Sequence, residues 1–107
     1  MLYKIEDILY QNNGKGQYLT SKVGEKYDER RGKVIVLYEE DITIGFPYVL
    51  NYIGVPGYII TTPVQSIYKF TPQNSAKEYT YLATSNSIYV LSEVHYKVEQ
   101  TYDKQYY

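Results

Sequence analysis

The sequence contains no cysteine, no tryptophan and one histidine, His95. The absence of cysteine excludes a disulfide framework, a thiolate zinc site and a cysteine nucleophile. A catalytic histidine needs an orienting acid and a nucleophile, and the sequence shows no such grouping around His95. We therefore expect His95 to face solvent, and no catalytic, metal-binding or cofactor-binding residue is predicted.

An excess of charge of one sign is also missing. The chain has 11 basic and 12 acidic residues and a formal net charge of -1. A general nucleic-acid binder usually has a basic excess, and a mimic of DNA would need a strongly acidic one. No window approaches the roughly 20 apolar residues of a membrane helix, and the first residues lack the apolar core of a signal peptide. We expect no membrane association and a cytoplasmic location in a host cell.

Tyrosine, in contrast, is abundant, with 16 residues against two phenylalanines. Its ring combines a large apolar surface with a polar tip, which suits both strand faces and protein-binding surfaces. A small domain cannot bury so many hydroxyl groups, so several tyrosines should lie at the surface. The alternative explanation is codon usage in an AT-rich genome, which does not exclude an interface.

The 107 residues predict one domain, residues 1–107, with a single hydrophobic core. Short segments rich in β-branched and aromatic residues, bounded by Pro, Asn or Ser, predict antiparallel strands, and residues 58–91 should form the central meander. The fold class is mainly β (α+β), a bent antiparallel sheet or small barrel of about six or seven strands. The predicted strands are residues 17–23, 33–38, 48–53, 58–61, 64–70, 79–84, 87–91 and 94–99.

One N-terminal helix is predicted over residues 3–12. Its apolar side chains recur at i, i+3, i+6 and i+7, which places them on one helical face across an opening of the barrel. A first strand is the alternative, because Tyr3, Ile5 and Asp7 also alternate. The helical pattern is carried by Leu2, Ile5, Ile8 and Leu9.

Two charged segments favour solvated connections. Residues 24–33 mix acidic and basic side chains and predict a mobile hairpin loop, whose basic residues are candidates for contact with phosphate or an acidic partner. Residues 39–41 are three consecutive acids. A hard cation draws its ligands from alternating loop positions or separate segments, so a solvated turn is the better interpretation.

Residues 61–67 (TTPVQSI) and 84–91 (TSNSIYVL) together resemble a strand-and-turn pattern in small uncharacterised β-rich proteins of phages and mobile elements of Gram-positive bacteria. The resemblance covers the last half of the chain and contains no active-site motif. It implies a mobile-element origin. That group includes anti-CRISPR and other anti-defence inhibitors, which act by binding a host effector.

These observations favour a non-enzymatic protein-binding inhibitor of the anti-CRISPR type that docks on a host protein such as a CRISPR nuclease. A single-stranded nucleic-acid-binding domain is an alternative, since Tyr beside Lys on a strand face can stack bases, although the charge balance disfavours it. A structural or assembly protein that adds its sheet edge to a partner is another. The sequence does not indicate an oligomeric state. The candidate partner contacts are Tyr27, Arg30, Arg31, Tyr79, Tyr81, Tyr89 and Tyr96.

Overall fold

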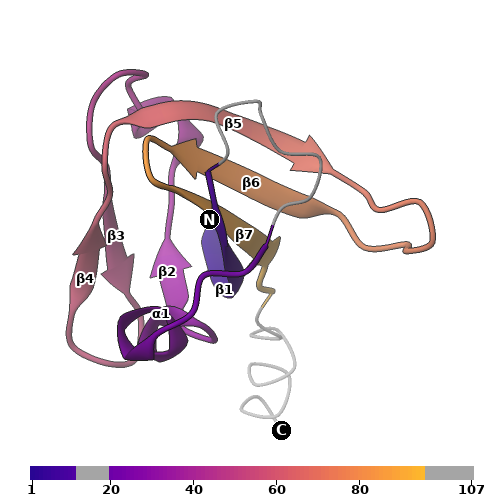
Figure 1. Ribbon diagram of the computed structural model, residues 1–107, viewed down its shortest axis with the longest axis horizontal. Coiled ribbons are helices and arrows are strands. Elements are labelled where there is room, and N and C mark those ends of the chain that lie inside the picture. Colours follow the sequence, from indigo (N-terminus) through magenta and orange to yellow (C-terminus); the bar gives the residue numbers. More distant parts are fainter. Residues whose placement is uncertain (12–19, 96–107) are drawn as a thin grey trace, which may run out of the picture.

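The computed structural model describes residues 1–11 and 20–95, which form one antiparallel sheet with a short helix (Figure 1). The mainly β fold class is thereby confirmed. No helix in these ranges combines the length and the apolar composition needed to cross a bilayer. In chain order the elements are β1 (Leu2–Tyr10), α1 (Glu25–Arg30), β2 (Val34–Val36), the 3-10 helix η1 (Glu39–Asp41), β3 (Val49–Tyr52), β4 (Tyr58–Ile60), β5 (Val64–Phe70), β6 (Tyr79–Thr84) and β7 (Ser87–Glu93).

The strand order is β4-β3-β2-β1-β7-β6-β5, so consecutive strands β4 and β5 form the two opposite edges. A flat sheet of this size would separate its edges by about 29 Å, given a spacing of about 4.8 Å between neighbouring strands. The link from Ile60 to Val64 can span at most about 14 Å. The sheet must therefore curl until one end of β4 approaches the start of β5.

The main core fills the inside of this curl. It is a single cluster of buried side chains to which every strand of the described sheet contributes, including both edges through Ile59 of β4 and Val64 of β5. Tyr27 of α1 packs against the same cluster. The fully buried members of largest volume include Ile5, Ile8, Ile35, Leu37, Leu50, Ile59, Leu82 and Leu91.

The predicted N-terminal helix is wrong, because residues 2–10 form strand β1 at the centre of the sheet. A β-bulge explains the misleading spacing. Between Ile5 and Asp7 the register advances two residues on β1 for one on β7, so that Ile5 and Ile8 both point into the main core. A bulge inserts one extra residue, so the side chains beyond it point to the opposite face from the one that strict alternation would give. The i, i+3 spacing of these two isoleucines comes from this insertion.

Strand β5 contains a second bulge, between Val64 and Ser66. It has the same effect, since Val64 is fully buried in the main core and Ile67, three residues later, packs against that core. Tyr68 and Phe70 then lie on the outer face and are 44% and 46% exposed. The bulge therefore interrupts the regular alternation of this strand, which would otherwise place Val64 on the same face as Tyr68 and Phe70.

The predicted hairpin loop at residues 24–33 is also wrong, since it contains helix α1. This six-residue helix has no buried residue, so it lacks the apolar repeat from which a helix is recognised. It is held instead by Tyr27 against the core and by polar contacts of the arginines that end it.

The remaining predicted strands agree with the observed strands to different degrees. Strands β5 and β6 have the predicted bounds, and β7 starts at the predicted Ser87 but continues to Glu93. Strands β2, β3 and β4 are shorter than the predicted 33–38, 48–53 and 58–61. For residues 17–23, positions up to 19 lie outside the described residues, and Ser21 forms only an isolated bridge with Leu9. For residues 94–99, positions 94 and 95 are not in a strand and the rest lie outside the described residues.

Replacing Ile8 by Ala should lower the free energy of unfolding by about 2–5 kcal/mol, because a fully buried side chain leaves a cavity in the main core. Urea unfolding followed by circular dichroism measures the change. The matched control is Val49→Ala, whose side chain is 43% exposed and whose loss should cost less than about 1 kcal/mol. Equal losses in the two variants would contradict the inward position of Ile8.

Candidate functional site

A small pocket with basic walls lies between α1, the β4–β5 link and the β6–β7 turn. Its volume is about 90 Å³, and we call it the basic pocket. A water needs roughly 10–15 Å³ of such space, so the pocket has room for several waters or one small ion. The polar residues that line it are Lys22, Lys26, Tyr27, Arg30, Thr62, Thr84, Asn86, Ser87 and Tyr89.

Lys22 is the most unusual of these residues, because its side chain is buried without a carboxylate. Only 7% of the residue is exposed, and its Nζ donates a hydrogen bond of 2.8 Å to the Ser87 hydroxyl. The ammonium lies 4.9 Å from the centre of the Tyr27 ring and 5.5 Å from that of Tyr10. Aromatic faces attract a cation electrostatically, so these rings partly replace the lost hydration.

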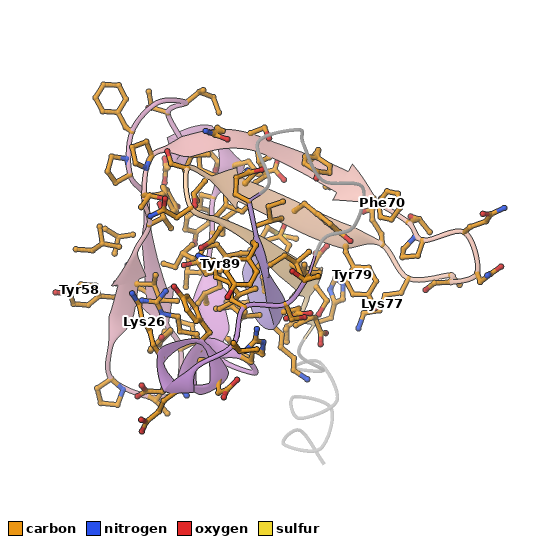
Figure 2. All side chains as sticks on the ribbon, in the orientation of Figure 1. Lys26, Tyr58, Phe70, Lys77, Tyr79 and Tyr89 are labelled. Carbon is orange, nitrogen blue, oxygen red and sulfur yellow. The ribbon has the colours of Figure 1, made fainter. Side chains whose placement is uncertain are left out.

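Two further cations approach the same ring. Lys26 Nζ lies 5.5 Å and Arg30 Cζ 5.7 Å from the Tyr27 centroid. Arg30 also donates from Nη1 to the Tyr89 hydroxyl over 3.1 Å. Figure 2 shows Lys26 and Tyr89 near α1. No Asp or Glu lines the pocket, and in the described part of the chain no carboxylate is in ion-pair range of Lys22, Lys26 or Arg30.

Arg31 fixes the position of the segment that carries Lys22. Its guanidinium pairs with Asp7 at 3.0 Å and with Asp28 at 2.8 Å, and it donates to the carbonyl oxygens of Ile8 and Lys22. The amide of Lys22 in turn donates to the Ile8 carbonyl over 2.8 Å. The backbone of Lys22 is thus held between β1 and the end of α1, which directs its side chain into the basic pocket.

The Asp7 carboxylate is the anionic centre of this contact. Burial opposes its ionisation, but hydrogen bonds from Ser21 and Arg31 outweigh burial and lower its pKa below the ordinary 3.8. On the same face of β1, a hydrogen bond from Ser92 and the nearby Lys77 lower the pKa of Glu6. Both groups are therefore charged in the folded protein at neutral pH.

The outer side of β5 and β6 carries four aromatic rings, which we call the aromatic face: Tyr68, Phe70, Tyr79 and Tyr81. Tyr68 and Tyr81 are cross-strand partners with ring centres 5.3 Å apart, and Phe70 meets Tyr81 edge to face at 5.7 Å. Such pairs are favourable arrangements of aromatic rings. Beside them, Lys77 lies 5.5 Å from the Tyr79 ring but also pairs with Glu6 at 3.3 Å.

The predicted contact residues divide between these features. Tyr27 and Arg30 line the basic pocket, and Tyr79 and Tyr81 belong to the aromatic face. The prediction that Tyr89 and Arg31 are free for surface contacts is wrong. Tyr89 is only 3% exposed, and the Arg31 guanidinium forms an ion pair with Asp7. Tyr96 lies outside the described residues.

His95 is exposed, as predicted, and its Nε2 lies 3.6 Å from Oε1 of Glu93. Sequence reasoning missed Lys22, Thr62 and Ser87 as pocket residues. One signal was present, because Lys22, Lys26 and Arg30 are spaced by four residues and would share a face if the segment were helical. The mixed charges of residues 24–33 concealed it.

Comparison with family models, with curated proteins and with solved structures finds no match to this chain. Within residues 1–11 and 20–95, no group of three or more His, Cys, Asp or Glu residues is placed to hold a metal ion. The basic pocket and the aromatic face are therefore the two candidate functional features of the described residues.

Asp7→Asn should lower the free energy of unfolding at pH 7 by about 1–2 kcal/mol, since it removes a charge-assisted contact that is partly screened by solvent. Because the folded pKa of Asp7 is depressed, its contribution is present above pH 4–5 and is lost as pH falls through the folded value. The difference from the unmodified protein should therefore shrink in acid, as measured by urea unfolding at several pH values.

Asp28→Asn is the matched control for this experiment. Asp28 pairs with the same arginine, but its side chain is 71% exposed, so its loss should change stability by less than about 0.5 kcal/mol. A penalty for Asp7→Asn that is independent of pH, or no larger than that of Asp28→Asn, would show that Asp7 does not anchor this contact.

Proposed function

We propose that this chain is a non-enzymatic protein-binding domain whose partner adds an extended segment to the open edge of β5. The observation that carries the proposal is the length and exposure of that edge. Strand β5 has seven residues, and among the strands of residues 1–11 and 20–95 it pairs only with β6. On its other side, within the described residues, only Val64 makes backbone hydrogen bonds: its carbonyl accepts from the Gly45 amide, and its amide donates to the Phe46 carbonyl.

The aromatic face lies directly beside this edge and supplies side-chain contacts. In strand addition, main-chain hydrogen bonds provide affinity and alternate side chains provide specificity. Tyr68 and Phe70 are nearly half exposed, and aromatic residues are enriched at protein interfaces. The partner segment that fits is extended and apolar on alternate positions, so that its side chains cover these rings.

The opposite edge of the sheet is less suited to this role. Strand β4 has three residues, and short edge strands are a common means of preventing unwanted pairing. Its exposed side chains, Tyr58 and Ile60, still make it the natural comparison for experiments. Both edges expose large apolar groups, but of the two edge strands in the described part of the chain β5 has the longer row of main-chain donors and acceptors.

For the identity of the partner we propose a host nuclease, with the chain acting as an anti-defence inhibitor of the anti-CRISPR type in the host cytoplasm. This part of the proposal is supported by the resemblance of residues 61–67 and 84–91 to small proteins of phages and mobile elements. Residues 64–67 of that pattern belong to the β5 edge itself.

Phe70→Glu should weaken partner binding by at least tenfold, because a charge would replace a large apolar contact in the interface. The partner is first captured from a Gram-positive bacterial lysate, identified by mass spectrometry and then titrated against purified variants. Tyr58→Glu is the matched control, because it places the same charge on the β4 edge, where Tyr58 is 61% exposed. Thermal melting confirms that both variants fold.

If Tyr58→Glu abolishes binding and Phe70→Glu does not, the docking site is not the β5 edge. If the unmodified chain captures no partner, the protein-binding function is rejected. A captured nuclease whose cleavage rate is unchanged by the chain would reject the inhibitor role alone. A dimeric mass for the purified chain that becomes monomeric with Phe70→Glu would instead indicate assembly through the same edge.

The exposed rings also favour a second candidate, single-stranded nucleic-acid binding by base stacking. The observation against it is the ion pair between Lys77 and Glu6, which neutralises the cation nearest to Tyr79. Filter binding of single-stranded DNA and RNA at low salt decides between the two, because phosphate contacts are strongest there. Retention that depends on Tyr68 and Phe70 would support this second function.

A further inference from the structure

The basic pocket contains three positively charged side chains that no carboxylate of the described residues neutralises. Lys22, Lys26 and Arg30 converge on the ring of Tyr27, and no carboxylate of the described residues balances them. Burying an ammonium such as that of Lys22 is costly unless it gains strong partners. An anion in the pocket would supply the missing partner for all three side chains.

Three hydroxyl groups that line the pocket retain the capacity to donate a hydrogen bond. The Ser87 hydroxyl oxygen accepts a hydrogen bond from Lys22 Nζ, and the Tyr89 hydroxyl oxygen accepts one from Arg30 Nη1. The Thr62 hydroxyl oxygen accepts one from the backbone N–H of Asn86. No described residue accepts the hydrogen of any of the three. Since each of these oxygens already accepts, its own hydrogen remains available for donation. Burial raises the pKa of Tyr89, which keeps this hydroxyl protonated.

We propose that the basic pocket binds a phosphate group in its dianionic form. A tetrahedral oxyanion with several acceptor oxygens and no obligatory donor matches a wall of ammonium, guanidinium and hydroxyl donors. The volume of about 90 Å³ accommodates one such group but leaves little room for a second. Three converging cations favour two negative charges over the single charge of a carboxylate or a phosphodiester.

This site is separate from the Phe70 end of the proposed docking edge. Figure 2 shows Lys26 and Tyr89 on the α1 side of the molecule, whereas Phe70, Tyr79 and Lys77 lie at the far end of the β5–β6 hairpin. Thr62 and Thr84 of the pocket adjoin Val64 at the start of β5, so a partner that covers the Phe70 end leaves the pocket open. Failure of either proposal leaves the other intact, because Phe70→Glu does not touch the pocket.

Isothermal titration calorimetry with inorganic phosphate, methyl phosphate, dimethyl phosphate and acetate tests the proposal on the full chain. Inorganic phosphate and methyl phosphate should bind at least tenfold more tightly than dimethyl phosphate or acetate. Tighter binding of inorganic phosphate would indicate a free ion as the natural ligand, and tighter binding of methyl phosphate would indicate a phosphomonoester. Equal binding of all four anions, or of monoester and diester, would overturn the proposal.

Variants connect the binding to the pocket. Arg30→Gln and Lys26→Gln should each weaken methyl phosphate binding by about tenfold, since each removes a charge-assisted hydrogen bond. The control is Lys69→Gln, an exposed lysine on β5 that lines a separate hollow. If Lys69→Gln weakens binding as much as the pocket variants, the interaction is non-specific and the site is rejected. Lys22→Met is a further variant, used only if its thermal melt shows a folded chain.

The pH dependence provides a separate readout. The second pKa of a phosphomonoester is about 6, so its dianion becomes dominant above that pH. The titratable groups that face the pocket are Lys22, Lys26, Tyr27, Arg30 and Tyr89, and neither His nor a carboxylate is among them. Methyl phosphate should therefore bind several-fold more tightly at pH 7.5 than at pH 5.5, whereas sulfate binding should stay constant. A flat profile for methyl phosphate would contradict preference for the dianion.

Discussion

The chain passes from one edge of the sheet to the other through residues 61–63, and the shortness of this link limits how far apart the edges can lie. The link is fixed at several points, since the Thr61 amide donates to the Tyr48 carbonyl and the Ser85 amide donates to the Pro63 carbonyl. Because the sheet must curl to satisfy it, side chains from β4 and β5 enter the same core as those from the central strands. A flat sheet of the same sequence would leave that inner face open to water.

The same constraint creates the basic pocket. Thr62 belongs to the link, Ser87 follows the β6–β7 turn, and Arg30 comes from α1, three parts of the chain that meet only because the sheet is curled. The outer face has the opposite character, with exposed rings along β5 and β6. The curled sheet therefore has a small basic pocket at one place and, among the described residues, an edge strand β5 that pairs on one side at another.

The sequence predicted the sheet well where strands alternate regularly, as in β6, and where a two-residue turn joins two apolar runs, as between β6 and β7. It failed at β1, where the inserted residue of the bulge gives Ile5 and Ile8 a helical spacing. The basic pocket could not be predicted from the sequence, for another reason. Lys22 and Ser87 are 65 residues apart, and only the tertiary fold brings the ammonium to the hydroxyl. Helix α1 is too short to show a period.

The two bulges also determine how this protein can tolerate changes of length. Each adds one residue to a strand, and that residue sets which face all side chains beyond it occupy. Removing Glu6 would place Ile5 and Asp7 next to each other, opposite Leu91 and Val90, so the pairing would continue without a bulge and Ile5 and Ile8 would still face the core. In β5, loss of Gln65 would likewise join Val64 to Ser66 and keep Val64 and Ile67 on the inner face. Loss of a residue elsewhere in either strand would instead turn one part of that strand to the opposite face.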